Sequence, residues 1–208
     1  MMYGRECFTV FLFLLKFFCK IDMKIEGTEN IPKGENFIIA AKHVSVWETF
    51  FFAWYFHIPV YILKKELMYI PVFGWFLWRT GMVGIDRKGG KSARNQIVEA
   101  SFDVIEKQKR NLVIFPQGTR TPIDSRYSLE KYPYKKGILS MCENLPNVKV
   151  LLATNNSVKY CGKSFISLKK AGTVTIKFLP SIQMKGKTGN EFLKEIQDTI
   201  ETETKKII

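Results

Sequence analysis

Short apolar runs alternate with helical patterns along the chain, and this alternation predicts an α/β fold. Apolar runs bounded by turn residues predict strands, and apolar residues spaced three or four apart predict helices. Strands are expected at residues 36–41, 60–63, 82–85, 112–115, 148–153 and 173–179. Helices are expected at residues 45–56, 92–110 and 136–143 and from residue 190 onward, and residues 71–79 are expected as a helix or turn. The 208 residues suit a single α/β domain.

The N-terminal pattern differs, because residues 7–15 are almost wholly apolar before Lys16 interrupts the run. A membrane-spanning helix needs about 20 apolar residues, so this run is too short for one. No small-residue cleavage site follows, so a removed signal peptide is also disfavoured. Basic residues around the run favour a helix in the membrane interface or a shallow anchor, and a core helix is the alternative. We therefore expect a membrane-associated segment at 1–25, followed by a single domain at 26–208.

The net charge of +13 predicts an anionic partner, which could be nucleic acid, anionic lipid or a phosphorylated substrate. No helix-turn-helix, RNA-binding or zinc signature supports nucleic acid. The chain has no acidic residue between Glu143 and Glu191, although eight lysines lie there. Near an anionic bilayer each lysine contributes about 1 kcal/mol of attraction. The alternative is an ordinary solvated surface that happens to be rich in lysine.

The cysteines and tryptophans each allow a narrower expectation. Four cysteines show no CxxC pair and no metal-type spacing with the two histidines, which predicts free thiols in a reducing compartment and no zinc site. All four tryptophans lie between residues 47 and 78. Because tryptophan prefers the boundary between water and lipid, this cluster favours a surface that meets lipid or holds an acyl chain. A tryptophan-lined core is the competing interpretation.

The first candidate for chemistry is His43, which follows a predicted strand and precedes a predicted helix. If Glu48 lies in the first turn of that helix, its carboxylate can orient one nitrogen of the imidazole. The other nitrogen then becomes a better general base for a hydroxyl. The sequence from Ser45 to Glu48 also matches a helix capping box, in which Glu48 binds the Ser45 backbone N–H. The motif alone leaves both interpretations open.

Two further segments could bind an anion. Residues 115–120 follow a predicted strand, and there Gly118 allows close backbone approach, Thr119 offers a hydroxyl and Arg120 offers a planar fork for phosphate. Residues 81–87 place glycines around a short strand that leads to Arg87 and a basic cluster. Taken singly, each segment is equally consistent with an ordinary turn.

The order of these elements resembles the glycerolipid acyltransferase family, the PlsC-type enzymes. The family's His-x4-Asp block is similar to His43–Glu48, and its Phe-Pro-Glu-Gly-Thr-Arg block is similar to residues 115–120. Its Gly-x-x-x-Arg block resembles residues 84–87, and its Val-Pro-x-Ala-x-Asn-Ser block resembles residues 150–157. A Lys-x-Glu-Leu stretch is similar to residues 64–67. The resemblance covers roughly residues 26–183.

This resemblance implies a mixed, largely parallel central sheet flanked by helices. It implies that His43, paired with Glu48, deprotonates a glycerol hydroxyl, which then attacks an acyl thioester without an acyl-enzyme or a metal. Arg120 would hold the phosphate of the acceptor. The remaining substrate-binding residues would be Lys64, Arg87, Gln117, Gly118 and Thr119.

The chain departs from the family pattern at three points. Glu48 stands where the family has Asp, Gln117 stands where it has Glu, and the fourth block lacks its proline. The carboxylate survives at position 48, whereas Gln117 keeps hydrogen bonding and loses charge. The change at position 117 therefore bears on the choice of acceptor.

The predicted function is transfer of a fatty acyl group to lysophosphatidic acid in phospholipid biosynthesis. The donor would be acyl-CoA or acyl carrier protein, and no cofactor is expected. The enzyme would lie on an anionic membrane surface, peripherally or shallowly anchored, with its active site toward the cytoplasm. The alternatives are an acyltransferase for another lysolipid, such as a lyso-ornithine lipid, and a basic membrane-binding protein without catalysis.

Overall fold

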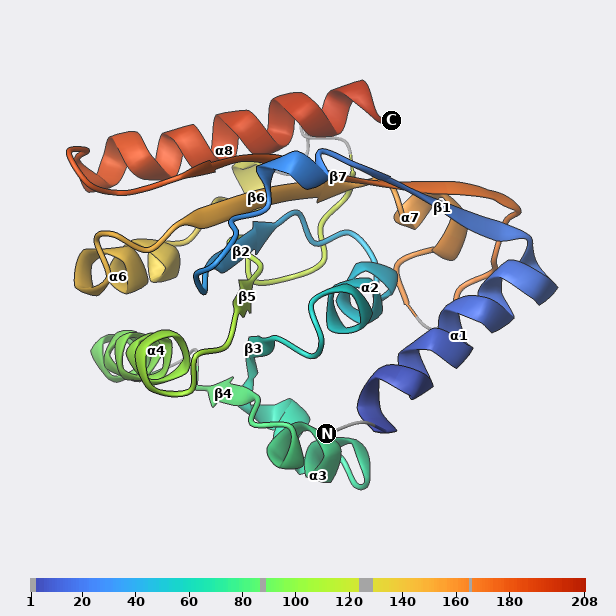
Figure 1. Cartoon of the computed structure of the whole chain (residues 1–208), viewed down its shortest axis with the longest axis horizontal. Coiled ribbons are helices and arrows are strands. Elements are labelled where there is room, and N and C mark those ends of the chain that lie inside the picture. Colours follow the sequence, from blue (N-terminus) through green and yellow to red (C-terminus); the bar gives the residue numbers. More distant parts are fainter. Residues whose placement is uncertain (1–2, 87–88, 124–128, 165) are drawn as a thin grey trace.

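A computed structural model describes residues 3–86, 89–123, 129–164 and 166–208. One seven-stranded sheet runs through it in the order β1-β7-β6-β2-β5-β3-β4 (Figure 1). All neighbouring strands are parallel except β6 and β7, which are antiparallel. The strands are β1 (Ile21–Glu26), β2 (Ile38–Ala41), β3 (Val60–Lys64), β4 (Val83–Ile85), β5 (Leu112–Ile114), β6 (Val150–Asn155) and β7 (Gly172–Ile182). The predicted mixed, largely parallel sheet is confirmed.

Helices cover both faces of the sheet (Figure 1). The α-helices are α1 (Tyr3–Cys19), α2 (Trp47–Tyr55), α3 (Phe73–Arg79), α4 (Lys91–Phe102), α6 (Gly137–Asn144), α7 (Val158–Cys161) and α8 (Gly189–Lys206). Short 3₁₀ helices occupy Thr28–Asn30 and Lys65–Tyr69, and a π-helical turn over Asp103–Lys107 extends α4. Every helix and strand expected from the pattern is present, whereas β1 and α7 were not predicted.

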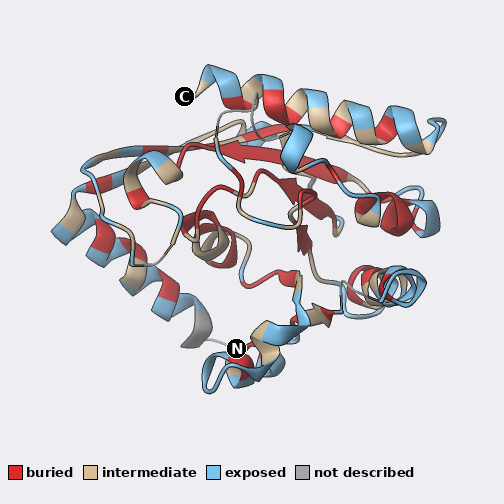
Figure 2. Cartoon of the chain, turned by 180° about the vertical axis from the view of Figure 1, so that it is seen from behind, coloured by how far each residue is buried: buried red, intermediate tan, exposed pale blue. Residues whose placement is uncertain are grey.

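Strand β2 shows why the sheet is buried on both sides. Its residues alternate between faces, so Ile39 and Ala41 pack into the cluster formed with α1, α2 and α3. Ile38 and Ala40 pack into the opposite cluster, formed with α6, α8 and the end of α4. A strand covered on both faces has no polar side to show, which explains the uninterrupted apolar run in the sequence. Figure 2 shows the buried residues gathered along this central layer.

Helix α1 packs on the domain through one face and leaves another face exposed. Phe8, Leu12 and Leu15 are buried in the cluster that includes α2. The outward side carries exposed Phe13 and Phe17, together with Val10, Leu14 and Phe18. None of the helices in the described part of the chain is both long enough and apolar enough to cross a membrane. The sheet itself begins at Ile21, inside the segment predicted at 1–25.

The tryptophans divide between the two interpretations that the sequence left open. Trp47 is buried and stacks on Phe51 in the core. Trp75 and Trp78, on α3, are exposed. Phe8 and Phe76 are in ring contact, so α3 lies next to the N-terminal part of α1.

Candidate active site

The parallel strands bring the predicted motifs together at one edge of the sheet. Strand β2 lies between β6 and β5, and β3 lies beyond β5. Because these strands are parallel, their carboxyl ends meet, and ligand sites of α/β proteins collect at such edges. His43 follows β2, residues 115–120 follow β5, Lys64 ends β3, and residues 155–157 end and follow β6. Topology therefore assembles a site from segments more than 100 residues apart.

His43 and Glu48 form a direct pair. Nδ1 of His43 lies 2.9 Å from Oε1 of Glu48, and Glu48 is fully buried. A carboxylate only accepts hydrogen bonds, so Nδ1 carries the ring proton and a neutral imidazole keeps its lone pair on Nε2. The ring stacks on Phe115, with centroids 3.9 Å apart and planes inclined by 15°. These contacts hold the ring in the orientation that a general base requires.

The carboxylate of Glu48 accepts hydrogen bonds from several further groups. Its Oε1 accepts the backbone N–H groups of Val44, at 2.7 Å, and Ser45, at 2.8 Å. Its Oε2 accepts a hydrogen bond of 2.8 Å from Oγ of Ser157. The bond expected from the capping-box interpretation is thus present alongside the pair with His43. A buried carboxylate needs such donors, because an unpaired buried charge is costly.

Asn155 and Ser157 are site residues to which the sequence assigned no role. Oγ of Ser157 lies 2.6 Å from Oδ1 of Asn155, which also accepts the Ser157 N–H at 3.1 Å. Nδ2 of Asn155 donates to the Lys42 carbonyl at 3.1 Å. The fourth block therefore anchors both the carboxylate of Glu48 and the backbone beside His43. Its resemblance to the family pattern was the one available signal for this role.

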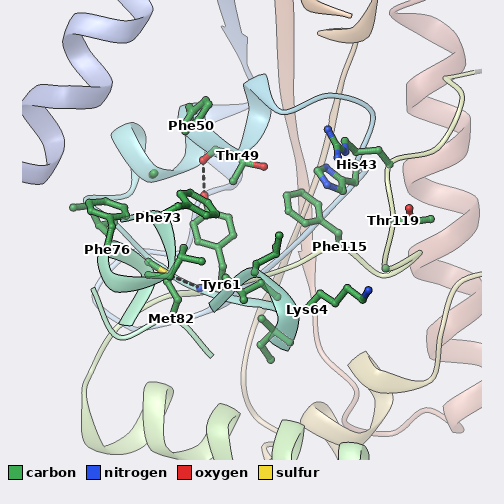
Figure 3. Close-up of a pocket in the computed structure, with 18 of the residues that line it drawn as sticks. His43, Thr49, Phe50, Tyr61, Lys64, Phe73, Phe76, Met82, Phe115 and Thr119 are labelled. Atoms are coloured by element: carbon green, nitrogen blue, oxygen red, sulfur yellow. Dashed lines mark hydrogen bonds between the residues drawn. The ribbon is translucent and has the colours of Figure 1, made fainter. Parts of the chain in front are cut away.

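An apolar cavity of about 360 Å³ opens beside His43. Figure 3 shows His43 and Phe115 at one end of it, and Phe73, Phe76 and Met82 toward the other. Its remaining apolar lining comes mainly from α1, α2, β3 and α3. Polar groups are few and lie near the histidine, and they include Lys64, Gly118, Thr119 and Arg120. A long apolar chain with a polar, anionic head suits such a cavity.

The basic residues that were predicted to bind substrate differ from one another in their surroundings. Arg120 donates from Nη1 to the Lys163 carbonyl at 2.8 Å, which fixes part of its guanidinium beside the cavity. Lys64 pairs with Glu66 at 3.1 Å, with about half of each side chain exposed. Such an exposed pair contributes little, so the ammonium is free to exchange partners. Arg87 lies outside the residues that the structure describes.

The structure does not bring Gln117 to the cavity. The side chain is 2% exposed, and its Nε2 donates to the Tyr132 carbonyl at 3.0 Å. Its Oε1 lies 3.1 Å from Oγ1 of Thr121, whose N–H donates to the His43 carbonyl at 2.8 Å. Gln117 thus connects two loops next to His43. A carbonyl acceptor facing position 117 explains why an amide fits there better than a carboxylate.

Replacing Gln117 with glutamate is expected to lower the free energy of unfolding at pH 7 by about 1–3 kcal/mol. The introduced carboxylate would face the Tyr132 carbonyl, and neither group can donate a hydrogen bond. The protonated carboxyl can donate, so the folded state favours it and the variant loses stability as pH rises through about 4 and above. Thermal unfolding from pH 4 to 8, compared with the unaltered protein, measures this. A deficit that does not change with pH would contradict the assignment.

The cysteines take no part in this geometry. All four are free thiols, as predicted. Burial raises the pKa of both Cys142 and Cys161 to about 12, which keeps these thiols protonated and poorly nucleophilic. Within the described ranges, no three His, Cys, Asp or Glu side chains are grouped so that they could hold a metal ion. The reaction without a metal or cofactor stays a prediction.

Comparison with known proteins agrees with the fold and the motifs. A family model described as Acyltransferase matches residues 22–154. The chain is 31% identical over 175 residues to a 1-acyl-sn-glycerol-3-phosphate acyltransferase of Pseudomonas aeruginosa, covering 84% of this chain and 65% of that protein. A protein of the same name from Saccharomyces cerevisiae is 26% identical over 206 residues, covering 95% of this chain and 64% of its own length. The chain thus spans a little under two thirds of these relatives.

A solved structure supports the same fold. The 1-acyl-sn-glycerophosphate (LPA) acyltransferase PlsC from Thermotoga maritima superposes with a TM-score of 0.70 at 23% identity. The match covers 99% of this chain and 76% of that one. The family model extends from β1 to β6 and includes the His43–Glu48 pair and the loop at 115–120. The chain therefore belongs to the acyltransferase family.

Proposed function

We propose that this chain transfers a fatty acyl group from an acyl thioester to the sn-2 hydroxyl of lysophosphatidic acid, giving phosphatidic acid. The observation that carries the proposal is the His43–Glu48 pair at one end of an apolar cavity, with Arg120 beside it. A base, an apolar chain site and a cation are the groups that this reaction needs. The names of the relatives agree with the proposal.

In the proposed reaction, Nε2 of His43 takes the proton of the acceptor hydroxyl as its oxygen attacks the thioester carbonyl carbon. A C–O bond forms and a tetrahedral intermediate carries the negative charge on the former carbonyl oxygen. The intermediate collapses by breaking the C–S bond, and the imidazolium returns the proton to the departing thiolate. Glu48 stabilises the imidazolium and, through the bonds from Val44, Ser45 and Ser157, keeps its own position.

The phosphate of the acceptor would bind the cations near the base. Arg120 offers its remaining guanidinium N–H groups, and Lys64 can leave its exposed partner Glu66. Gly118 and Thr119 line the same end and offer close backbone approach and a hydroxyl. Arg87 is assigned a supporting role in binding from the family resemblance alone. Gln117 would act by holding the loop, because its amide is already engaged on both atoms.

Replacing Arg120 with alanine is expected to raise the KM for lysophosphatidic acid by about 10- to 100-fold, the effect of losing a charged hydrogen bond. The kcat should fall less, because the phosphate is bound in both the ground state and the transition state. Initial rates at varied acceptor concentration measure both constants. Arg94→Ala, an exposed arginine on α4, is the matched control. An unchanged KM would remove Arg120 from phosphate binding.

The reaction itself is tested by thioester release against a panel of lysolipids. Purified protein receives either acyl-CoA or acyl carrier protein as donor, and free thiol and acylated product are both measured. Lysophosphatidic acid should be the preferred acceptor. Preference for a lyso-ornithine lipid would assign the chain to a sibling reaction. Membrane binding without transfer to any acceptor would support a non-catalytic protein instead.

The proposed location is a membrane surface, with the protein attached peripherally or shallowly and its active site toward the cytoplasm. The exposed side of α1, around Phe13 and Phe17, supports this, and so do Trp75 and Trp78 on α3. Aromatic side chains of this kind are favoured at the boundary between water and lipid. The cavity reaches Phe8 of α1 and Phe73 of α3, so an acyl chain could enter from that side.

A further inference from the structure

The loop that follows α7, formed by residues 162–164 and 166–170, exposes two aliphatic side chains almost completely. Ile166 is 93% exposed and Leu168 is 91% exposed, the highest values among the large hydrophobic side chains of the described residues. Single exposed hydrophobic residues are common on protein surfaces. Two such residues with nearly full exposure on one short loop form an apolar projection that the described part of the chain leaves uncovered.

The backbone of this loop is held by its own hydrogen bonds. Ser164 N–H donates to Oγ of Ser167 at 3.0 Å, and Ser167 N–H donates to the Ser164 carbonyl at 3.2 Å. Lys170 N–H donates to the Tyr160 carbonyl at 2.8 Å. Gly162 has a φ of 68°, and a Cβ there would lie 2.3 Å from Cβ of Ser167. Hydrogen bonds therefore hold the described backbone on either side of Ile166 and Leu168.

Charge and position identify the surface that fits this loop. Exposed Lys163 and Lys170 flank the two aliphatic residues, and the sequence has no acidic residue between Glu143 and Glu191. The loop also lies against α1, because Ser164 and Lys169 share a crevice with residues of that helix. The loop therefore lies beside α1, a helix that carries exposed apolar side chains of its own. Apolar side chains flanked by lysines match an anionic bilayer.

The same loop accepts hydrogen bonds from two segments of the candidate active site, the one that follows His43 and the one that contains Arg120. Oγ of Ser45, two residues after the base, donates to the Gly162 carbonyl at 2.6 Å. Nη1 of Arg120 donates to the carbonyl of the next residue, Lys163, at 2.8 Å. Each partner is an uncharged backbone group, so these contacts depend on the path of the loop rather than on its side chains. A shift of the loop would therefore move the guanidinium of Arg120 relative to His43.

We propose that Ile166 and Leu168 insert into an anionic bilayer, and that docking of this loop sets the position of Arg120 for a lipid acceptor. The proposal rests on the proposed function for its second half, and its first half, membrane contact, stands without it. Helix α1 would supply one point of attachment and the loop after α7 a second. Two points of contact would orient the cavity toward the lipid. With α1 as the single point of contact, the protein could rotate about that helix.

The test uses the full chain with Ile166→Ser and Leu168→Ser combined. Sedimentation with vesicles of phosphatidylglycerol and phosphatidylcholine should show binding weakened by about 10-fold or more, since two aliphatic side chains that would insert into the bilayer are lost. Phe102→Ser, an exposed residue on α4 on the far side of the molecule from α1, is the matched control and should bind normally (Figure 1). Lys163→Gln with Lys170→Gln should instead reduce the preference for phosphatidylglycerol over pure phosphatidylcholine vesicles.

The second readout separates docking from chemistry. With acceptor presented in vesicles, the aliphatic double variant should lose kcat/KM by about the same factor as it loses binding. With a short-chain acceptor and donor that stay monomeric in water, its kcat/KM should equal that of the unaltered protein. Loss of both activities would mean that the loop serves folding of the site, and would overturn its assignment to lipid.

Two other outcomes also decide the question. Unchanged vesicle binding by the aliphatic double variant would overturn the proposal. Unchanged vesicle binding together with a raised KM for acyl carrier protein would assign the loop to that acidic partner instead. If the unaltered protein transfers acyl groups to no lysolipid, the proposed function fails, while the vesicle measurement still tests membrane contact.

Discussion

Replacing His43 with alanine is expected to lower the rate of acyl transfer by about 10²- to 10⁴-fold, the usual contribution of a positioned general base. Among the described residues that line the cavity, His43 is the one histidine, and it is held against a buried carboxylate. Binding of lysophosphatidic acid should change little, because the ring removes a proton and does not hold the phosphate. Single-turnover thioester release, with equilibrium binding of the acceptor measured separately, distinguishes the two effects.

The chain offers a matched control in its second histidine. His57 is exposed, has a φ of 55° and does not line the cavity. Asparagine tolerates that backbone conformation, so His57→Asn should keep both fold and activity. The circular dichroism and vesicle binding of the His43→Ala protein should match those of the unaltered chain. If His43→Ala transfers acyl groups at the normal rate, the proposed mechanism is wrong.

Replacing Glu201 with alanine is expected to lower the free energy of unfolding by about 3–5 kcal/mol. Lys42 lies directly before His43, but its side chain points to the opposite face of the sheet, under α8. It is 0% exposed, and its Nζ lies 2.6 Å from Oε1 of Glu201, which also accepts from the hydroxyl of Tyr134 at 3.0 Å. Burial lowers the pKa of Lys42, and Glu201 opposes that shift. Removing the carboxylate would leave a buried ammonium without its counter-charge.

Urea unfolding at pH 7 measures this loss. Glu203→Ala is the control on the same helix, because Glu203 pairs with Lys177 at 2.7 Å in a more exposed setting. That substitution should cost about 1 kcal/mol or less. Combining Lys42→Met with Glu201→Leu should recover much of the stability, since it removes both charges together. Equal losses for Glu201→Ala and Glu203→Ala would show that the buried pair contributes no more than a surface pair.

Much of the fold was predictable because the core strands are apolar on both faces. Residues 112–115 and 148–153 stand out as apolar runs because both faces of β5 and β6 are covered. Strand β1 escaped prediction for the opposite reason. It lies at the edge of the sheet, and its sequence from Ile21 to Glu26 alternates apolar and charged residues beside the N-terminal apolar run. Its pairing with β7 joins residues about 150 positions apart, which no local pattern reveals.

The candidate site was predictable only in part. The order of short motifs was enough to single out His43, Glu48 and Arg120, because each motif is local. The contact between Ser157 and Glu48 was not predictable, because it joins residues 109 positions apart. Gln117 illustrates the same limit. Its place in the motif suggested contact with the acceptor, whereas folding buries it against the Tyr132 carbonyl.

By itself, the sequence determined the α/β class, most element positions and the choice of His43 as the candidate base with Glu48 as its candidate partner. These follow from periodicity and from motifs within a few residues of one another, where physical constraints are local. Only the tertiary structure decided which groups support His43, where the cavity runs and which side chains are left uncovered. Those properties depend on which strands become neighbours, and strand order brings Asn155, Phe115 and His43 together from three distant segments. The buried pair beneath α8 and the exposed Ile166 and Leu168 are decided in the same way, by packing between distant elements.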